Sequence, residues 1–200
     1  MRLILVRHGQ TDWNKEYRVQ GQSDTILNDH GKSEAEALAG ALKDEALDAI
    51  YSSTLARAMQ TAEAINAFHH VELTPVDALK ELDVGETDGT CYPDMATLFP
   101  DLHRVWRADP AAARWPGGES LSELQERAWA AVNDIIENSG HNSVLIISHL
   151  FVINVLLCRI LGMGISDFRR LDTSVASISV VEFAGDKVRL VSFNDTCHLR

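Results

Sequence analysis

The sequence predicts an α/β domain built as a three-layer sandwich, in which helices flank a mostly parallel central sheet and a small helical insertion caps the core. Short apolar runs typical of buried strands alternate along the chain with longer segments whose apolar residues recur at helical spacing. Residues 83–118 interrupt this alternation with several glycines and prolines. We therefore expect a single domain over residues 1–200, with the cap insertion at about 83–118.

The first half of the chain contains candidate strands at residues 3–6, 49–51 and 71–74, and a polar loop is expected from the first strand through Asn28. A helix is expected from about Gly31 to Glu45, because its apolar residues form one stripe. That stripe consists of Ala35, Leu38, Ala39 and Leu42. A second helix is expected from about Thr54 to Phe68, with Ser52 and Ser53 as its capping residues. Its inward face consists of Leu55, Ala58, Ala62 and Ile65.

The second half continues the alternation of strands and helices. A long helix is expected from about Ser120 to Glu137, followed by a buried strand at 144–147 and a helix at 150–161 that Gly162 ends. The inward face of the long helix consists of Leu121, Leu124, Ala128, Val132 and Ile135. Two final strands, 177–183 and 187–193, are expected to form a hairpin around Gly185 and Asp186.

Charge and cysteine content narrow the class of protein. Asp and Glu number 29 against 18 Lys and Arg, so the formal net charge is −11, which disfavours binding to nucleic acid or to an anionic membrane. Three cysteines lie far apart, which indicates a reducing compartment and no zinc motif. The N-terminal apolar run at 3–6 is too short for a signal peptide, and polar residues interrupt the apolar stretch at 144–161. We expect a cytoplasmic protein without a membrane helix.

Basic and imidazole side chains follow three of the predicted strands. Arg7 and His8 come directly after the first strand, Arg57 lies in the first turn of the helix after the second, and His149 follows the strand at 144–147. Ligands in open α/β sheets bind beyond the carboxyl ends of the strands, so these residues are expected to meet at one rim. Arginine forks and a helix N-terminus match the oxygens of a phosphoryl group. Taken singly, each residue is more often structural, and their joint placement is what predicts a phosphate site.

The same residues carry a resemblance to a known family. The sequence resembles the histidine phosphatase, or phosphoglycerate mutase-like, superfamily in blocks that follow the family's order over nearly the whole chain. These blocks are Arg7-His8-Gly9-Gln10-Thr11, Asn14, residues 20–24, Leu27, residues 52–62, residues 79–85, residues 116–120 and Ser148-His149. Residues 20–24 resemble the phosphatase branch, which includes α-ribazole phosphatases and related broad-specificity phosphatases.

The resemblance implies a role for each matching residue. His8 is implied as the nucleophile that takes the phosphoryl group, and Glu81 as the proton donor to the leaving oxygen and later the base towards water. The residues implied to cradle the phosphoryl oxygens are Arg7, Arg57 and His149, with Asn14 adding a donor. Gln20 and Gly21 match positions where the family contacts substrate. No metal and no cofactor are implied, since the arginines supply the positive charge.

The sequence departs from the family pattern in two places. Leu150 and Phe151 follow the second histidine, where the family often has glycine, and they narrow the expected pocket. The backbone amide of Leu150 can still face the phosphate, so we count Leu150 among the substrate-binding residues. Residues 173–177 replace an Asn-Ala-Ser-like run, which leaves substrate recognition at that edge open.

The cap residues admit two interpretations. Aromatic and basic side chains in it either contact the non-phosphate half of the substrate or simply pack the cap onto the core. These side chains are Tyr92, His103, Arg104, Trp106, Arg107 and Trp115.

The function predicted from the sequence is metal-independent hydrolysis of a small phosphorylated metabolite through a phosphohistidine intermediate. One alternative is a phosphoglycerate mutase, although the additional basic, proline-rich segment typical of such mutases has no counterpart here. A second alternative is a catalytically inactive module of the same fold that binds phospholigands or proteins. The sequence predicts no nucleic-acid or membrane partner and leaves a homodimer open.

Overall fold

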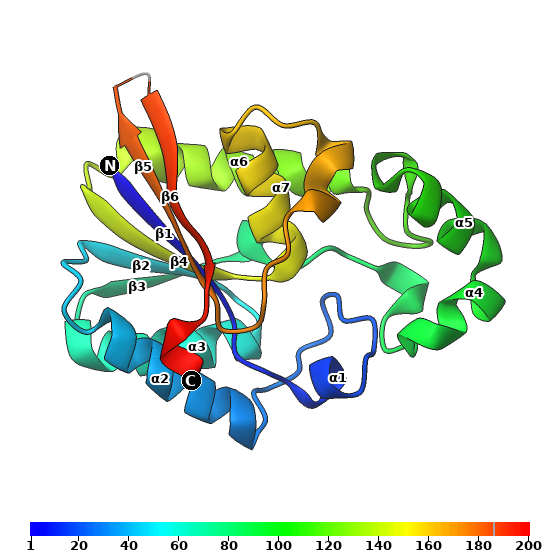
Figure 1. Cartoon of the computed structure of the whole chain (residues 1–200), viewed down its shortest axis with the longest axis horizontal. Helices are drawn as coiled ribbons and strands as arrows, with labels where there is room; N and C mark the ends of the chain where they lie inside the picture. Colours follow the sequence, from blue (N-terminus) through cyan, green and yellow to red (C-terminus); the bar gives the residue numbers. More distant parts are fainter. Residues whose placement is uncertain (186) are drawn as a thin grey trace.

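The computed structural model describes residues 1–185 and 187–200, and its centre is a six-stranded sheet in the order β3-β2-β4-β1-β5-β6 (Figure 1). The strands are β1 (Arg2–Arg7), β2 (Ala49–Ser53), β3 (Glu72–Val76), β4 (Ser143–Ser148), β5 (Ile178–Ala184) and β6 (Lys187–Asp195). The first four strands in this order run parallel, whereas β5 and β6 pair antiparallel. The predicted hairpin is therefore present, and Asp186, which was expected at its turn, lies outside the described residues.

Helices cover both faces of the sheet, as the predicted three-layer sandwich requires. The helices are α1 (Asp12–Lys15), α2 (Asp29–Leu42), α3 (Ala56–His69), α4 (Met95–Leu98), α5 (Pro100–Ala108), α6 (Leu121–Asn138) and α7 (Leu150–Ile160). Among the described residues, no helix combines the length and the apolar character needed to cross a bilayer.

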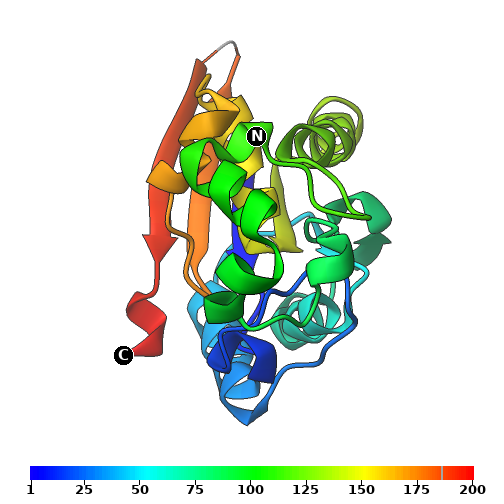
Figure 2. The same ribbon diagram turned by 90° about the vertical axis from the view of Figure 1, so that its right-hand side faces the viewer.

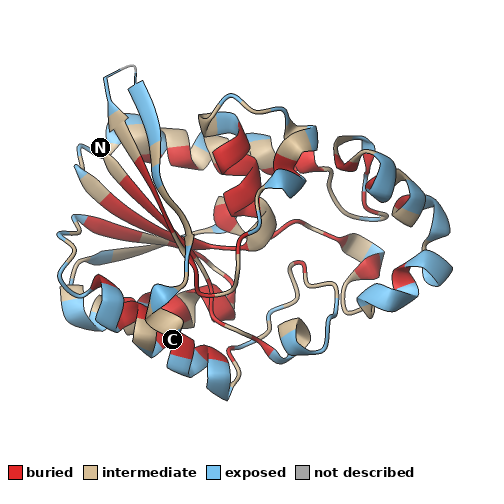
Figure 3. Cartoon of the chain, viewed as in Figure 1, coloured by how far each residue is buried: buried red, intermediate tan, exposed pale blue. Residues whose placement is uncertain are grey.

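Alternation along β1 shows how the two cores form. Leu3 and Leu5 pack into the cluster that contains the inward faces of α6 and α7, while Ile4 and Val6 pack into the cluster formed with α2 and α3. This follows from the period of two in a strand, which sends successive side chains to opposite faces. Figure 3 shows the buried residues concentrated along the sheet and the inner sides of these helices. All the inward-face residues expected in the predicted helices at 31–45, 54–68 and 120–137 are buried.

Two local predictions need correction. Ser52 and Ser53 do not cap a helix as side chains; they continue β2, paired with β3, and α3 begins only at Ala56 with Leu55 as its N-cap. Strand pairing holds both serines in β2, and the first amide of α3, that of Ala56, donates instead to Asp24 Oδ1 at 2.7 Å. The region before Asn28 was expected to be only a polar loop, yet it contains α1, which begins with a capping box between Thr11 and Asn14.

Residues 83–118 form the predicted cap, which projects from one end of the sheet and faces the viewer in Figure 2. It contains α4, α5 and three short 3₁₀ turns, Gly85–Thr87, Tyr92–Asp94 and Pro110–Ala112. Its two ends meet in a narrow neck, where the amide of Glu86 donates to Pro116 O at 2.9 Å. Gly85 has a φ of 49°, and a Cβ there would lie 2.0 Å from that same carbonyl oxygen, so the neck requires glycine.

Aromatic side chains fasten the cap to the core. The ring of Trp106 in α5 lies 5.4 Å from Trp115, 5.8 Å from Phe151 in α7 and 5.4 Å from Phe168, which belongs to the 3₁₀ segment Ile165–Arg170. The guanidinium of Arg169 stacks 5.0 Å from the centre of the Trp106 ring and donates to its backbone carbonyl. These contacts bury Trp106 and fix the cap against α7.

Candidate active site

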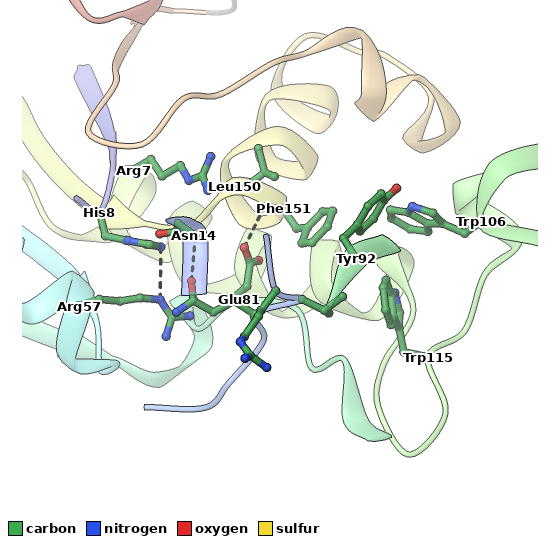
Figure 4. A pocket seen from close by; sticks show the side chains of 13 residues that line it. Arg7, His8, Asn14, Arg57, Glu81, Tyr92, Trp106, Trp115, Leu150 and Phe151 are labelled. Atoms are coloured by element: carbon green, nitrogen blue, oxygen red, sulfur yellow. Dashed lines mark hydrogen bonds between the residues drawn. The ribbon is translucent and has the colours of Figure 1, made fainter. Parts of the chain in front are cut away.

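The basic and imidazole side chains from three strand ends meet at one point. His8 follows β1, Arg57 lies in the first turn of α3 after β2, and His149 follows β4. The rings of His8 and His149 have centroids 5.0 Å apart, and Nε of Arg57 lies 3.3 Å from Nε2 of His8 (Figure 4). Because β1, β2 and β4 are parallel neighbours, their carboxyl ends bring together residues 140 positions apart, as the sequence predicts.

The imidazole of His8 is held as one neutral tautomer. Its Nδ1 lies 2.7 Å from the carbonyl oxygen of Gly9, and since a carbonyl only accepts, Nδ1 carries the proton. The lone pair therefore lies on Nε2, where it accepts from Arg57 Nε. Burial, and then the nearby Arg57 and Arg7 guanidiniums, hold the pKa of His8 well below its ordinary value. A neutral ring with an unprotonated Nε2 is the form that can attack phosphorus.

Arg57 is a fully buried cation with fixed orientation. Its Nη2 donates to Gly21 O at 2.7 Å and its Nη1 to Ser23 O at 2.9 Å. Burial lowers the pKa of Arg57 to about 10, which leaves the guanidinium charged at neutral pH. Because both Nη atoms donate to these two carbonyls, the guanidinium is oriented with its Nε–H towards His8.

Arg7 has an unused donor beside His8. Its Nη1 donates to Thr173 O at 2.6 Å, while its buried Nε has no hydrogen-bond partner among the described residues. Burial lowers the pKa of Arg7 from its ordinary value. The negative charges of nearby carboxylates oppose this shift, and that of Glu81 has the largest effect among them. Buried polar atoms are rarely left without a partner, so an unpaired guanidinium nitrogen in a cavity indicates an anion site.

His149 lies behind His8 and is also neutral. Its Nε2 is 2.8 Å from Ser53 Oγ, a hydroxyl that already accepts from the amide of Leu55. The other ring nitrogen, Nδ1, is buried without a hydrogen-bond partner among the described residues. Burial, followed by the charge of Arg57, keeps the pKa of His149 well below its ordinary value.

Glu81 is a carboxyl group whose environment favours its protonated form. It is buried, and its two oxygens accept from the amides of Leu82 at 2.8 Å and Phe151 at 3.2 Å. Burial raises the pKa of Glu81 above its ordinary value, against the lowering effect of those two amides and of the arginines. Glu81 therefore keeps its proton to a higher pH than an exposed glutamate does, and it can release that proton to a leaving oxygen.

Arg7, His8, Arg57 and Glu81 line a cavity of about 210 Å³. Its lining residues are Arg7, His8, Asn14, Arg18, Val19, Gln20, Arg57, Glu81, Tyr92, Trp106, Trp115, Leu150 and Phe151. The end near His8 carries the arginines and the carboxyl group, while aromatic rings from the cap and α7 stand at the other end (Figure 4). Trp106 and Trp115 pack the cap onto the core and also line the cavity, so the packing interpretation is confirmed for these two rings, while their contact with substrate stays a prediction.

Some predicted residues lie apart from the cavity wall. Gly21 and His149 are not among its described lining residues, and neither are the cap residues His103, Arg104 and Arg107. A Cβ at Gly21 would lie 2.5 Å from Val84 Cγ2, so packing against Val84 explains this glycine. Its carbonyl serves the site by accepting from Arg57.

Asn14 and Gln20 form a polar pair on the wall. The Asn14 side-chain oxygen accepts from the Thr11 amide at 3.0 Å, and its Nδ2 donates to Gln20 Oε1 at 3.0 Å. The capping box of α1 thus orients Asn14 towards Gln20 and the cavity. Both residues are where the sequence prediction placed them.

The sequence prediction missed three contributors to this site. Arg18 lies on the cavity wall, held by Glu16 at 2.6 Å and by Gly89 O at 3.0 Å. The amide of Phe151 anchors Glu81, and the carboxylate of Glu34 accepts from the amide next to Gly9. A sequence pattern gives no sign of the Phe151 amide contact, because every residue other than proline has a backbone amide. For Glu34 the sequence offers one indication, a carboxylate that adjoins the apolar stripe of its helix.

A buried neutral imidazole beside two guanidinium groups and a carboxyl group with a raised pKa is an arrangement suited to phosphoryl transfer. The chain belongs to branch 1 of the histidine phosphatase superfamily, whose family model matches residues 3–196. It is thus an enzyme of the histidine phosphatase type, phosphoglycerate mutase-like, as the resemblance implied.

Relatives and solved structures agree with this assignment. Phosphoserine phosphatase 1 of Hydrogenobacter thermophilus is 32% identical, covering 100% of this chain and 94% of the relative, and a probable phosphoglycerate mutase of Proteus mirabilis is 35% identical, covering 92% and 85%. The structure of YhfR from Bacillus stearothermophilus has a TM-score of 0.93 at 27% identity, with 100% and 99% coverage. The α-ribazole phosphatase of Shigella flexneri, at 24% identity over 98% and 96%, has the same fold with a TM-score of 0.90.

Proposed function

We propose that this protein is a phosphomonoester hydrolase that transfers the phosphoryl group of a small phosphorylated metabolite to His8 and then to water without a metal. The observation that carries the proposal is the unprotonated Nε2 of His8, which lies at the end of the cavity beside two buried guanidiniums. Phosphoryl transfer depends on in-line positioning and on compensation of charge at the equatorial oxygens. Arg7 and Arg57 can supply that charge from fixed positions.

In the first step, Nε2 of His8 attacks phosphorus while the bond to the ester oxygen breaks. The electron pair of that bond goes to the leaving oxygen, which takes the proton of Glu81 and departs as an alcohol. Nδ1 keeps its proton and its hydrogen bond to Gly9 O, so the positive charge that develops on the ring is shared with that carbonyl. Arg7 Nε, free of other partners among the described residues, donates to a phosphoryl oxygen.

In the second step, the oxygen of a water molecule attacks phosphorus while the ionised Glu81 accepts a proton from that water. The bond between phosphorus and Nε2 breaks, its electron pair returns to His8, and inorganic phosphate leaves. One carboxyl group can serve both steps because burial and the neighbouring arginines shift its pKa in opposite directions.

The wall opposite the phosphate end favours hydrolysis of esters with apolar leaving groups. Among the described residues of that wall, Arg18 is the only charged one, and Glu16 and Gly89 already engage its guanidinium. Phosphoglycerate would bring a carboxylate to a surface formed mostly by Tyr92 and the buried tryptophans, where an unpaired charge is costly. Phosphoglycerate mutase is the second candidate, favoured by the 35% identity to a relative of that name.

The test is turnover of 4-nitrophenyl phosphate, benzyl phosphate, phosphoserine and 3-phosphoglycerate, with and without a chelator. We expect phosphate release that the chelator leaves unchanged, with the highest kcat/KM for the aryl and benzyl esters. His8→Ala abolishes turnover, whereas His141→Ala, at the far end of β4, keeps it. An acid-labile phosphoenzyme should appear on rapid quenching of the wild type.

Other results point to the alternatives. Isomerisation of 3-phosphoglycerate that exceeds phosphate release identifies a mutase. Absence of a phosphoenzyme and of turnover with every ester, in a protein that still binds phosphate, identifies an inactive binding module. Loss of activity on chelation contradicts the metal-free proposal.

A further inference from the structure

One peptide group lies between the His8 ring and a buried carboxylate. The carbonyl of Gly9, which accepts from His8 Nδ1 at 2.7 Å, belongs to the peptide group that joins Gly9 to Gln10. The N–H of the same peptide group, on Gln10, donates to Oε2 of Glu34 at 2.7 Å. The imidazole and the carboxylate are therefore connected by two hydrogen bonds through one planar, polarisable unit.

Glu34 is placed for this contact by unusually close packing. It lies in α2 with 6% of its surface exposed, and its other oxygen is 3.3 Å from Nε2 of the exposed His30. A Cβ on Gly31 would lie 2.0 Å from Gln10 O, and one on Gly9 would lie 2.5 Å from Gly31 O. Only glycine at both positions lets α2 approach the backbone closely enough for Glu34 to reach the Gln10 amide.

Neighbouring hydrogen bonds fix the orientation of this peptide group. The Gly9 amide donates to Thr61 Oγ1 at 3.2 Å, the Ala176 amide donates to His8 O at 3.1 Å, and the Asn28 amide donates to Gln10 O at 3.0 Å. Every backbone group that flanks the unit thus has a partner, so the unit cannot rotate to give Gly9 O another donor.

We infer that Glu34 is a positioning residue that acts on His8 through the Gly9–Gln10 peptide group. A negative charge on the amide side of a peptide polarises its carbonyl, and hydrogen bonds in a chain strengthen one another. A stronger acceptor at Gly9 O stabilises Nδ1–H when the ring becomes positive on bonding phosphorus. A carboxylate in direct contact with a catalytic histidine orients the ring and stabilises its positive charge, and Glu34 does the same through one intervening peptide group. The inference rests on the proposed role of His8 as phosphoryl acceptor.

Two other roles for Glu34 predict different results. Its charge also opposes the lowering of the Arg7 pKa, so it can act on phosphate binding directly. It can also contribute to stability alone, as a satisfied buried carboxylate. A direct effect on Arg7 changes KM and leaves His8 unaltered, and a purely structural role changes the free energy of unfolding alone.

The test is Glu34→Gln, which removes the charge but keeps an oxygen that accepts from the Gln10 amide. Asp48→Asn is the matched control, because Asp48 also accepts from two backbone amides but lies at the opposite end of the sheet. The His8 Nδ1 proton is observed by NMR in the resting enzyme, and the rate of phosphoenzyme formation is measured by rapid quench. We expect an upfield shift of that proton and a rate about tenfold lower, with little change in KM.

Glu34→Asp provides a second variant, since it keeps the charge but withdraws it by one methylene. We expect an upfield shift in the same direction, and no shift in Asp48→Asn. An unchanged Nδ1 proton in both Glu34 variants overturns the inference, as does a rise in KM without a fall in the phosphorylation rate. Because the NMR signal needs no turnover, a wild type that forms no phosphoenzyme contradicts the proposed function separately.

Discussion

At the scale of single residues, burial shifts the pKa of the acid and those of the imidazoles in opposite directions, whereas the arginines lower all of them. Burial raises the pKa of Glu81 and lowers those of His8 and His149, while the arginines lower all three. The result is an acid that keeps its proton to a higher pH than usual, next to imidazoles that lose theirs at a lower pH than usual. That is the pairing which the first transfer step needs.

The proton-donor role of Glu81 predicts an effect that depends on the leaving group. Glu81→Gln cannot protonate a departing oxygen, so kcat/KM for benzyl phosphate should fall about 10²–10⁴-fold. The loss should be much smaller for 4-nitrophenyl phosphate, because its phenolate leaves without a proton. Rates of phosphoenzyme formation for the two esters check this. Equal losses for both esters would show that Glu81 acts on position or charge and not as an acid.

The raised pKa of Glu81 also fixes the sign of a pH effect. The neutral form is the donor, so kcat/KM for the alkyl ester should decline as pH rises through the folded-state pKa of Glu81. Stability has the same sign: the folded state binds this proton more tightly than the unfolded state. The contribution is therefore present below the unfolded pKa and lost as pH rises through the folded one. Glu81→Gln should lack both dependences, measured by steady-state kinetics and by urea unfolding across pH.

At the scale of secondary-structure elements, the cap is held by its neck and by an aromatic cluster. The neck joins the cap to the chain through backbone hydrogen bonds such as that of Glu86 to Pro116, whereas the cluster around Trp106 packs the cap against α7. The same rings form the cavity wall. Packing of the cap and shape of the substrate site therefore depend on the same side chains.

Removal of the central ring of this cluster should be costly. Trp106→Ala should reduce the free energy of unfolding by about 3–5 kcal/mol, because it leaves a cavity among three aromatic rings and removes the stacking of Arg169. Phe68→Ala is the matched control, since Phe68 is 57% exposed, and its effect should stay within about 0.5 kcal/mol. Urea denaturation measures both. Similar losses in the two variants would mean that the cluster does not hold the cap.

Secondary-structure elements were predictable where the spacing of apolar residues along the sequence follows one period, that of a helix or that of a strand. The buried face of α6 is the stripe from Leu121 to Ile135, which the helical spacing gives directly. The start of α3 was misplaced because Ser52 and Ser53 have cap chemistry, yet pairing with β3 keeps them in a strand. Local propensity cannot register a neighbouring strand that lies more than twenty residues away.

At the scale of the whole molecule, the site was predictable as a set of strand ends but not as a hydrogen-bond network. Arg7, His8, Arg57 and His149 each follow a strand of one parallel sheet, so the topology alone brings them together. The contact of Glu34 with the Gln10 amide depends on two glycines packing backbone against backbone, and the contact of Phe151 with Glu81 depends on how α7 is placed. Neither contact leaves a spacing that a sequence pattern can show.

The protein carries a net negative charge, so the proposed anion site is a local region of positive charge, and its presence can be tested by the binding of inorganic phosphate. With a net charge of −11, the protein must gather its phosphate-binding cations in one buried cluster. A ligand that binds only the folded state adds about 2.7 kcal/mol at a hundred times its Kd, which for a domain of this size raises Tm by about 5–10 °C. Inorganic phosphate should give this shift in wild type beyond that of sodium chloride at equal ionic strength. Arg7→Met, which removes the unpartnered Nε, should reduce the shift to the general salt effect, as measured by calorimetry. An equal phosphate-specific shift in both proteins would place the anion elsewhere.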